Sequence, residues 1–272
     1  MTSLNGHVAL VTGCSRLSGI GRGVANALAR AGADLVLADV SAGGTRNSSE
    51  DGEDEAEAGW RGLPSLADEV AKHGVRAVMT TGDVGDRAQA ERMVEDGIRA
   101  FGKVDILVNN AAAPSGADRR LTWEVPDESF DEVMRVNFKG VFLMSTVVAR
   151  HLVEQGSGGR IINISSAIGL QPTAKRAVYA AAKAAGIAMM RAMAIELGPH
   201  GVTVNAVLPG QLHTSRQGPA RLATSAVGHE RVPVGRITRV EDVARAVVFL
   251  ADPEADGITG ECLNVNGGAF FL

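Results

Sequence analysis

Cysteine and tyrosine are scarce in this chain of 272 residues, which has two cysteines, Cys14 and Cys262, and a single tyrosine, Tyr179. Two cysteines are too few for a scaffold held together by disulfides, and this usage is typical of a reducing compartment. We therefore expect a cytoplasmic protein in which both thiols are structural.

Long apolar runs and an excess of positive charge are also absent. Stretches such as 141–149 are well short of the about 20 apolar residues that cross a bilayer, and the first six residues lack the features of a signal peptide. Lys and Arg number 27 against 31 Asp and Glu, whereas contacts to nucleic-acid phosphates need clustered positive charge. The composition favours a small-molecule substrate, with neither nucleic acid nor membrane as a partner.

Short β-branched runs alternate with longer amphipathic stretches. Strands are expected at residues 8–12, 35–38, 75–80, 104–109, 160–165, 202–207 and 262–265. Helices are expected from residue 21 to 29, at 86–101, from an N-cap at Asp127 past residue 144, at 176–198 and at 240–251. This alternation, with continuously apolar strands, predicts one α/β domain over residues 1–272, a doubly wound and mainly seven-stranded parallel sheet flanked by helices.

Two segments depart from the pattern. Residues 41–62 contain six acidic residues in the eight positions 50–57, which favours a solvated loop with like-charge repulsion, and Trp60 suggests that its far end is anchored. Residues 210–231 follow the sixth strand. Ligands of open α/β sheets bind at the carboxyl ends of the strands, so this second segment is expected to cover a substrate site.

A glycine-rich turn joins the first strand to the first helix at residues 12–21. Glycines there let the backbone approach a pyrophosphate, whose charge meets the helix N-terminus. Asp39 ends the second strand, where a carboxylate can accept hydrogen bonds from ribose hydroxyls and repel a 2′-phosphate, which favours NAD over NADP. Arg16 and Arg22 could reach a phosphate and leave NADP as the less favoured alternative.

Tyr179 and Lys183 are four residues apart and so share one face of an expected helix. A lysine cation beside a phenol lowers the tyrosine pKa toward neutrality, as a general acid/base for a secondary alcohol requires. Ser166 follows an apolar strand, and its hydroxyl could bind the substrate oxygen. An ordinary amphipathic helix produces the same spacing, so the pair alone decides little.

Taken together and in order, these pieces resemble the short-chain dehydrogenase/reductase family over nearly the whole chain. The matching pieces are the turn at 12–21, Asp39, Asp83-Val84, Asn109-Asn110-Ala111-Ala112, Asn137, Ser165-Ser166, Tyr179 with Lys183, and Pro209-Gly210 followed by Thr214. The resemblance implies a Rossmann-like fold, a nicotinamide cofactor, hydride transfer, no metal, and a homotetramer or homodimer.

The resemblance also implies a role for each matching residue. Tyr179 is the expected acid/base, Ser166 holds and polarises the carbonyl, Lys183 binds the nicotinamide ribose, and Asn137 holds a water in the proton relay. Asp83 is expected to meet the adenine. The cofactor-binding residues implied are Gly13, Ser15, Arg16, Gly19, Ile20, Gly21, Asp39, Asp83, Val84, Asn109, Ala111, Pro209, Gly210, Leu212 and Thr214.

The chain departs from the family pattern in its glycine-rich turn. Five residues, rather than the usual three, separate Gly13 and Gly19, so the pyrophosphate contact is open among Ser15, Arg16 and Ser18. A longer turn is similar to that of the enoyl reductases of the superfamily, but these have a wider Tyr–Lys spacing and lack the serine. Ala112 replaces a common glycine, a change expected to be tolerated. The spacing of Tyr179 and Lys183 therefore favours C=O rather than C=C chemistry.

The function expected is reversible NAD-dependent hydride transfer between a secondary alcohol and a ketone. The alternatives are a 3-oxoacyl thioester reductase using NADPH, a catalytically silent nicotinamide-binding sensor, and an interaction protein acting through the acidic segment. Trp123, the loop at 112–126 and residues 211–231 are expected to shape the substrate pocket. Several basic residues of the second segment could suit an acidic or phosphorylated substrate, but solvated loop charges are the favoured explanation. These residues are His213, Arg216, Arg221, His229 and Arg231.

Overall fold

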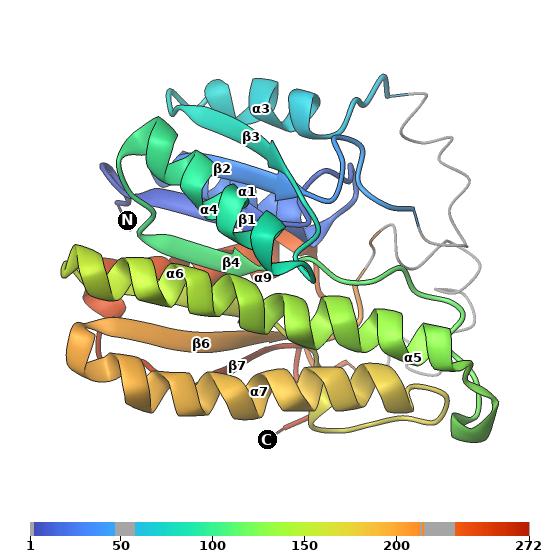
Figure 1. Cartoon of the computed structure of the whole chain (residues 1–272). Coiled ribbons are helices and arrows are strands. Elements are labelled where there is room, and N and C mark those ends of the chain that lie inside the picture. The colour runs from blue at the N-terminus through green and yellow to red at the C-terminus, as the bar shows by residue number, and fades with distance from the viewer. Residues whose placement is uncertain (1–2, 47–57, 213, 215–231, 272) are drawn as a thin grey trace.

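The computed structural model describes residues 3–46, 58–212, 214 and 232–271. Within this part of the chain, seven parallel strands form one sheet in the order β3-β2-β1-β4-β5-β6-β7 (Figure 1). The strands are β1 (Val8–Thr12), β2 (Asp34–Asp39), β3 (Ala77–Thr81), β4 (Ile106–Asn109), β5 (Gly159–Ile164), β6 (Val202–Pro209) and β7 (Cys262–Val265). The expected seven-stranded parallel sheet is confirmed.

Helices cover both faces of this sheet because successive strand residues point to opposite sides. Ala9 and Val11 of β1 pack in the cluster under α1 (Ile20–Arg30), α3 (Leu63–Ala71) and α9 (Val240–Ala251). Val8 and Leu10 pack instead under α4 (Arg87–Phe101), α6 (Val141–Gln155) and α7 (Ala177–Leu197), which lie in front of the sheet in Figure 1. The sequence pattern did not predict α3.

The long helix expected from Asp127 onward differs from the structure in two ways. Asp127 is the first residue of α5 (Asp127–Met134), and Pro126 occupies the N-cap without a side-chain cap. The Asp127 carboxylate still lies in the first turn, where it stabilises the positive end of the helix. A π-helical segment, Arg135–Gly140, then separates α5 from α6, and such widened turns are frequent at functional sites.

Residues Ala177–His200 form a helical stretch that is long and apolar enough to cross a membrane. This stretch escaped the sequence analysis, which considered shorter apolar runs. Part of its apolar surface lies in the core: Ile187, Met190 and Leu197 are buried where α7 packs against β6. Packing against the sheet therefore accounts for these apolar residues of α7.

The chain order across the sheet reverses at β1. From β1 the chain moves outward to β2 and β3, then crosses back to place β4 on the other side of β1. Such a switch point opens a crevice at the carboxyl ends of the two central strands, where α/β folds bind ligands. The glycine-rich turn after β1 and the loop after β4 lie at this crevice.

Candidate active site

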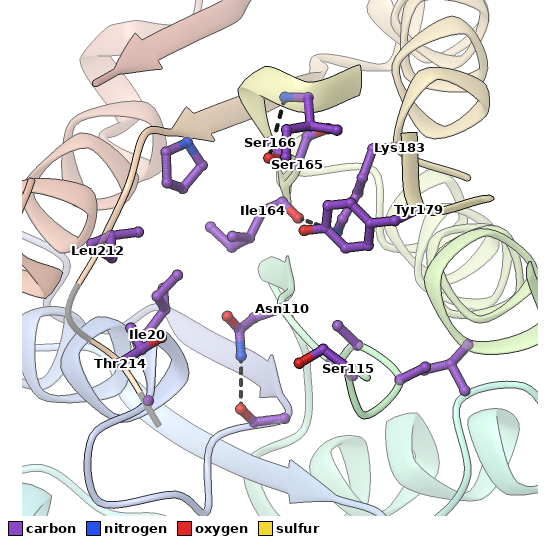
Figure 2. A pocket seen from close by; sticks show the side chains of 18 of the residues that line it. Ile20, Asn110, Ser115, Ile164, Ser165, Ser166, Tyr179, Lys183, Leu212 and Thr214 are labelled. Carbon is purple, nitrogen blue, oxygen red and sulfur yellow. Dashed lines mark hydrogen bonds between the residues drawn. The ribbon is translucent and has the colours of Figure 1, made fainter. Parts of the chain in front are cut away.

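A cavity of about 760 Å³ lies at the carboxyl ends of the strands. Its walls come from the glycine-rich turn, the loops after β4, β5 and β6, and the first turns of α7, several of which are drawn in Figure 2. The predicted site residues that line it are Gly13, Arg16, Gly19, Ile20, Asp39, Asp83, Val84, Ala111, Ser166, Tyr179, Lys183, Pro209, Gly210, Leu212 and Thr214. Most of the residues singled out from the sequence are therefore brought together.

Ser15, Gly21, Asn109 and Asn137 lie behind the cavity wall instead. Asn109 is 3% exposed, and its Nδ2 donates to Ser145 Oγ and Asn163 Oδ1, both at 2.9 Å. Its predicted role in cofactor binding stays a prediction, and this network holds its side chain between strands β4 and β5.

Asn110, to which the sequence analysis assigned no role, lines the cavity instead. Its Nδ2 donates to Thr12 O at 2.9 Å and to Gly13 O at 2.7 Å, which ties the loop after β4 to the glycine-rich turn (Figure 2).

Two glycines of the turn are required by close backbone contacts. Gly13 has φ +67°, and a Cβ there would lie 2.6 Å from Ala111 Cα. A Cβ on Gly21 would lie 2.5 Å from Gly13 O. The first turn of α1 therefore approaches the cavity directly behind Gly19, with unpaired backbone N–H groups of the kind that bind phosphates.

Among the three candidates for a pyrophosphate contact, Arg16 lines the cavity, whereas Ser15 is buried behind it and Ser18 is exposed outside it. Ser15 acts on Asp39 instead: its backbone N–H donates to Asp39 Oδ2 at 3.0 Å. Val40 N–H donates to Asp39 Oδ1 at 2.8 Å. These two bonds fix the carboxylate on the cavity wall.

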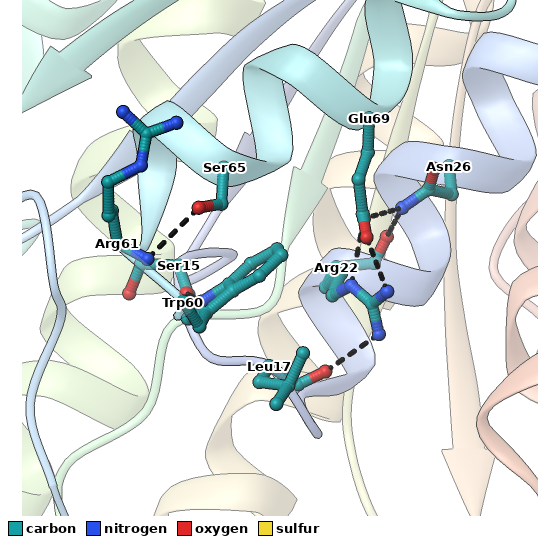
Figure 3. Close-up of polar contacts among 8 residues, drawn as sticks. All are labelled: Ser15, Leu17, Arg22, Asn26, Trp60, Arg61, Ser65 and Glu69. Atoms are coloured by element: carbon teal, nitrogen blue, oxygen red, sulfur yellow. Dashed lines mark hydrogen bonds and ion pairs between the residues drawn. The ribbon is translucent and has the colours of Figure 1, made fainter. Parts of the chain in front are cut away.

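Arg22 is held away from the cavity by its own partners (Figure 3). Its Nε and Nη2 donate to Glu69 at 2.9 and 2.6 Å, and its Nη1 donates to Leu17 O at 3.0 Å. The guanidinium also lies 5.0 Å from the centroid of the Trp60 ring. Of the two arginines that could reach a phosphate, only Arg16 lines the cavity.

Trp60 anchors the end of the acidic segment, as predicted: its Nε1 donates to Ser15 O at 2.6 Å. Residues 47–57 of that segment lie outside the described residues. A neighbouring cavity of about 390 Å³ shares Arg16 with the main one and is also lined by Gly43, Gly44, Arg46, Trp60, Arg61 and Gly62. The described parts of the acidic segment therefore adjoin the Asp39 end of the cavity.

Tyr179 and Lys183 lie on the cavity face of α7, with Ser166 at the end of β5 (Figure 2). Lys183 is 6% exposed, and its Nζ donates to Ile164 O at 2.8 Å and lies 5.7 Å from the Tyr179 ring centroid. Ser166 Oγ accepts from Ile168 N–H at 3.3 Å. A phenol, an ammonium group and a hydroxyl thus lie along one cavity.

Ser165 also lines this cavity, although the sequence analysis gave a role only to its neighbour. Its Oγ is buried and has no hydrogen-bond partner in the part of the chain that the structure describes. The apolar run that ends at Ile164 is the signal that could have found it, because both serines follow the strand into the cavity.

Asn137 lies in the π-helical segment, and its Oδ1 accepts from Ala113 N–H at 2.8 Å. Its Nδ2 is buried and lacks a partner among the described residues. A buried donor of this kind is typically satisfied by an ordered water. The structure therefore fits a water-holding asparagine behind the cavity wall.

Asp83 lines the cavity close to Asp39, since Gly82 N–H donates to Asp39 O at 2.9 Å. Arg135 in the π-helical segment donates from Nη1 to Asp83 Oδ2. Burial lowers the pKa of Arg135, but the hydrogen bonds and charges of Glu132 and Asp83 outweigh it, so the net pKa is raised. This pairing fixes Asp83 on the wall.

The substrate end of the cavity differs from the expectation at Trp123. That side chain is 81% exposed and does not line the cavity, whereas Ala113, Pro114, Ser115, Asp118 and Arg119 of the same loop do. Trp123 lies in the short turn Thr122–Glu124, which contributes no buried residue, so its indole faces away from the core. The predicted basic residues His213, Arg216, Arg221, His229 and Arg231 lie outside the described residues.

Neither a metal cluster nor a reactive thiol is found in the described residues. They hold no group of three or more His, Cys, Asp or Glu side chains suited to a metal. Cys14 and Cys262 are buried free thiols, and burial, with the charge of Asp39, raises the pKa of Cys14 well above its ordinary value. Buried thiols of raised pKa are inert.

Comparison with known proteins decides the family. A family model described as enoyl-(acyl carrier protein) reductase matches residues 56–269. The 3-oxoacyl-(acyl-carrier-protein) reductase FabG of Salmonella typhimurium is 36% identical over 99% of this chain and 100% of its own length. The chain belongs to the short-chain dehydrogenase/reductase family.

Other dehydrogenases are also similar to this chain. The L-rhamnose 1-dehydrogenase (NAD(P)(+)) of Azotobacter vinelandii is 36% identical, covering 96% of this chain and 95% of the relative. The crystal structure of carveol dehydrogenase from Mycobacterium avium in complex with NAD is 30% identical, with a TM-score of 0.85 over 99% of both chains. This chain is thus similar in sequence and in its Rossmann-like architecture to dehydrogenases and reductases that act on CH–OH groups.

Proposed function

We propose that this short-chain dehydrogenase/reductase catalyses reversible NAD-dependent hydride transfer between a secondary alcohol and a ketone. The observation that carries the proposal is the placing of Tyr179, Lys183 and Ser166 along the same cavity as the glycine-rich turn and Asp39. Dehydrogenases of sugars, sugar acids and terpene alcohols among the relatives support the reaction class without naming the substrate.

The residues present fit a nicotinamide dinucleotide. Gly13 and Gly21 leave no room for a Cβ, so the backbone of the turn and the start of α1 can approach a pyrophosphate. Asp39 offers a fixed carboxylate for ribose hydroxyls, and Asp83 is fixed near it by Arg135. When bound, the cofactor supplies the site that accepts or returns the hydride.

In the oxidative direction, Ser166 Oγ holds the substrate oxygen and Tyr179 takes the hydroxyl proton. The Lys183 cation beside the Tyr179 ring stabilises the phenolate that receives this proton. Asn137 Nδ2 holds a water that returns the proton to solvent. In the reductive direction Tyr179 donates the proton to the carbonyl oxygen, and the same groups act in reverse.

NAD is the cofactor we propose, because the Asp39 carboxylate would repel a 2′-phosphate. One observation favours NADP as the second candidate: Arg16 lies between the main cavity and the neighbouring cavity that Arg46 and Arg61 also line. With NADPH, the chain would be a 3-oxoacyl thioester reductase, as the similarity to FabG suggests.

We also propose that the chain is a homo-oligomer in the cytoplasm. Phe142 and Val153 of α6 and Ile195 of α7 are exposed, by 41%, 36% and 79%. Apolar side chains gathered on helix surfaces are typical of interfaces between subunits. Light scattering at several protein concentrations would test this assembly, and a monomer at every concentration would contradict it.

The test of the proposed function is nicotinamide absorbance over time, with NAD and NADP in parallel, across a panel of secondary alcohols. NAD turnover supports the chemistry and the role of Asp39. Turnover with NADP alone keeps the chemistry and contradicts the cofactor assignment. NADH binding without turnover of any alcohol or ketone contradicts the enzyme and favours a nicotinamide sensor.

A further inference from the structure

We infer that the substrate carries a carboxylate, which Arg119 and Arg176 bind at the substrate end of the cavity. The inference rests on the proposed function and deepens it by naming the substrate class. Both arginines line the cavity that contains Tyr179 and Ser166. They come from separate elements, the loop after β4 and the N-cap of α7.

Arg176 is unusually placed for a cation. It is the N-cap of α7, and the first turn of that helix contains no acidic residue. A positive charge is unfavourable at the positive end of a helix dipole, whereas an anion is favourable there. No ion pair or side-chain hydrogen bond joins Arg176 to another described residue. Arg176 precedes Tyr179 by three residues, and both line the cavity.

The backbone before Arg176 is strained. Lys175 has φ +62° and is the one non-glycine residue with positive φ in the described ranges. Side chains other than glycine rarely adopt this conformation, and it persists where the surroundings impose it, often at binding sites. This strained residue immediately precedes Arg176, the N-cap of α7.

Arg119 has an unmet hydrogen-bonding group. Its Nε is buried and has no acceptor in the described part of the chain. Leaving a buried donor unpaired is costly, so this group in the cavity wall is available to a ligand that enters the cavity. Ser165, 9% exposed, adds a second unpaired donor to the same cavity.

Packing brings the Arg119 loop against the start of α7. Ala113 of this loop shares a buried cluster with Val178 and Ala182 of the helix. Asp118 also lines the cavity, and its Oδ1 accepts from Gly116 N–H at 3.1 Å, so this carboxylate holds the loop. Arg119 and Arg176 therefore outnumber the Asp118 carboxylate, which leaves a net positive charge at the substrate end of the cavity.

A carboxylate matches this environment better than a neutral group does. Guanidinium groups bind carboxylates through paired, charge-assisted hydrogen bonds, which are stronger and more directional than neutral ones. The anion would satisfy the Arg119 Nε, offset the charge of Arg176 and lie at the favourable end of α7. The substrate carbon to be oxidised then faces Tyr179 and Ser166 from the same cavity.

The experiment compares hydroxy acids with their uncharged esters. The kcat/KM values of 4-hydroxypentanoate and 5-hydroxyhexanoate are measured against their methyl esters, in the wild type, Arg119→Gln, Arg176→Gln and the control Arg120→Gln. Arg120 is exposed and does not line the cavity. We expect each cavity variant to raise KM for the acids by about 10- to 100-fold, with little change for the esters, and Arg120→Gln to change neither.

A second measurement does not depend on turnover. Binding of hexanoate and of hexanamide to the protein with NADH is measured by calorimetry in the same variants. Hexanoate binding that Arg176→Gln abolishes supports the inference, even where no alcohol is oxidised and the proposed function fails. Turnover with equal rates for acids and esters, together with equal binding of hexanoate and hexanamide, overturns the inference and leaves the proposed function intact.

Discussion

The ion pair between α1 and α3 offers a prediction with a matched control. Arg22 donates two hydrogen bonds to Glu69, at 2.9 and 2.6 Å, and Asn26 Nδ2 donates a third at 3.0 Å. One residue earlier on α3, Asp68 pairs with Arg61 at 2.6 Å through side chains that are 70% and 65% exposed. The side chains of Glu69 and Arg22 are only 26% and 33% exposed.

Glu69→Gln keeps the shape and removes the charge that Arg22 and Asn26 meet. Hydrogen bonds to charged groups contribute about 1.5–3 kcal/mol to stability, and neutral ones contribute about half of that. Because the Glu69 and Arg22 side chains are partly exposed, the difference is reduced. We therefore expect Glu69→Gln to lower the free energy of unfolding by about 1–2 kcal/mol. Asp68→Asn breaks an exposed pair and should change the free energy of unfolding by less than about 0.5 kcal/mol. Urea unfolding at one protein concentration measures both; equal losses would refute the reasoning.

The effect of Glu69 depends on pH in a defined direction. Burial raises the pKa of its carboxyl, but the hydrogen bonds from Arg22 and Asn26 and the charge of Arg22 lower it by more, so the net pKa lies below its ordinary value. Such a carboxyl stabilises the fold above its unfolded pKa, about 4.3, and this contribution is lost as pH falls through the folded pKa. The difference between wild type and Glu69→Gln should therefore be full at neutral pH and shrink below about pH 4; a constant difference would contradict the pairing.

Three further predictions concern the glycine-rich turn and its surroundings. Asp39→Asn should raise the ratio of NADP to NAD kcat/KM by at least about tenfold, because a repelling charge near the 2′ position is removed; an unchanged ratio would exclude Asp39 as the discriminating residue. Gly21→Ala should weaken NADH binding by about 5- to 150-fold, because the added Cβ meets the Gly13 backbone. Gly186→Ala, in open space on α7, should leave NADH binding unchanged and raise the free energy of unfolding by about 0.5–1 kcal/mol. Equal NADH affinities of the two variants would refute this. Cys14 should react with a thiol reagent at neutral pH only when the protein unfolds, since burial raises its pKa, and rapid labelling of the native protein would contradict its burial.

The fold was predictable because its central strands are short apolar runs buried on both faces, a pattern that the sequence displays directly. Two features were not. Helix α3 follows the acidic segment and buries only Leu63, Leu66 and Val70, so its apolar periodicity is brief. The π-helical widening around Asn137 depends on packing between α5, α6 and α7, which local sequence does not specify.

The candidate site was predictable to the level of motifs but not of side-chain direction. Asn109 and Asn110 stand side by side in the sequence, yet one is buried between strands and the other lines the cavity. Arg22 could reach a phosphate in the sequence pattern, and only the tertiary contact with Glu69 and Trp60 shows that it is held elsewhere. Such outcomes depend on partners 38 or more residues away in the chain.

The central claim is that Tyr179 transfers the proton while the surrounding residues bind the cofactor. The most direct measurement compares Tyr179→Phe with wild type for NADH affinity and for turnover of one responsive alcohol. The account predicts NADH affinity within about twofold and turnover lower by about 10²- to 10⁴-fold, the usual contribution of a positioned acid/base. Tyr179→Phe turnover close to that of the wild type would contradict it.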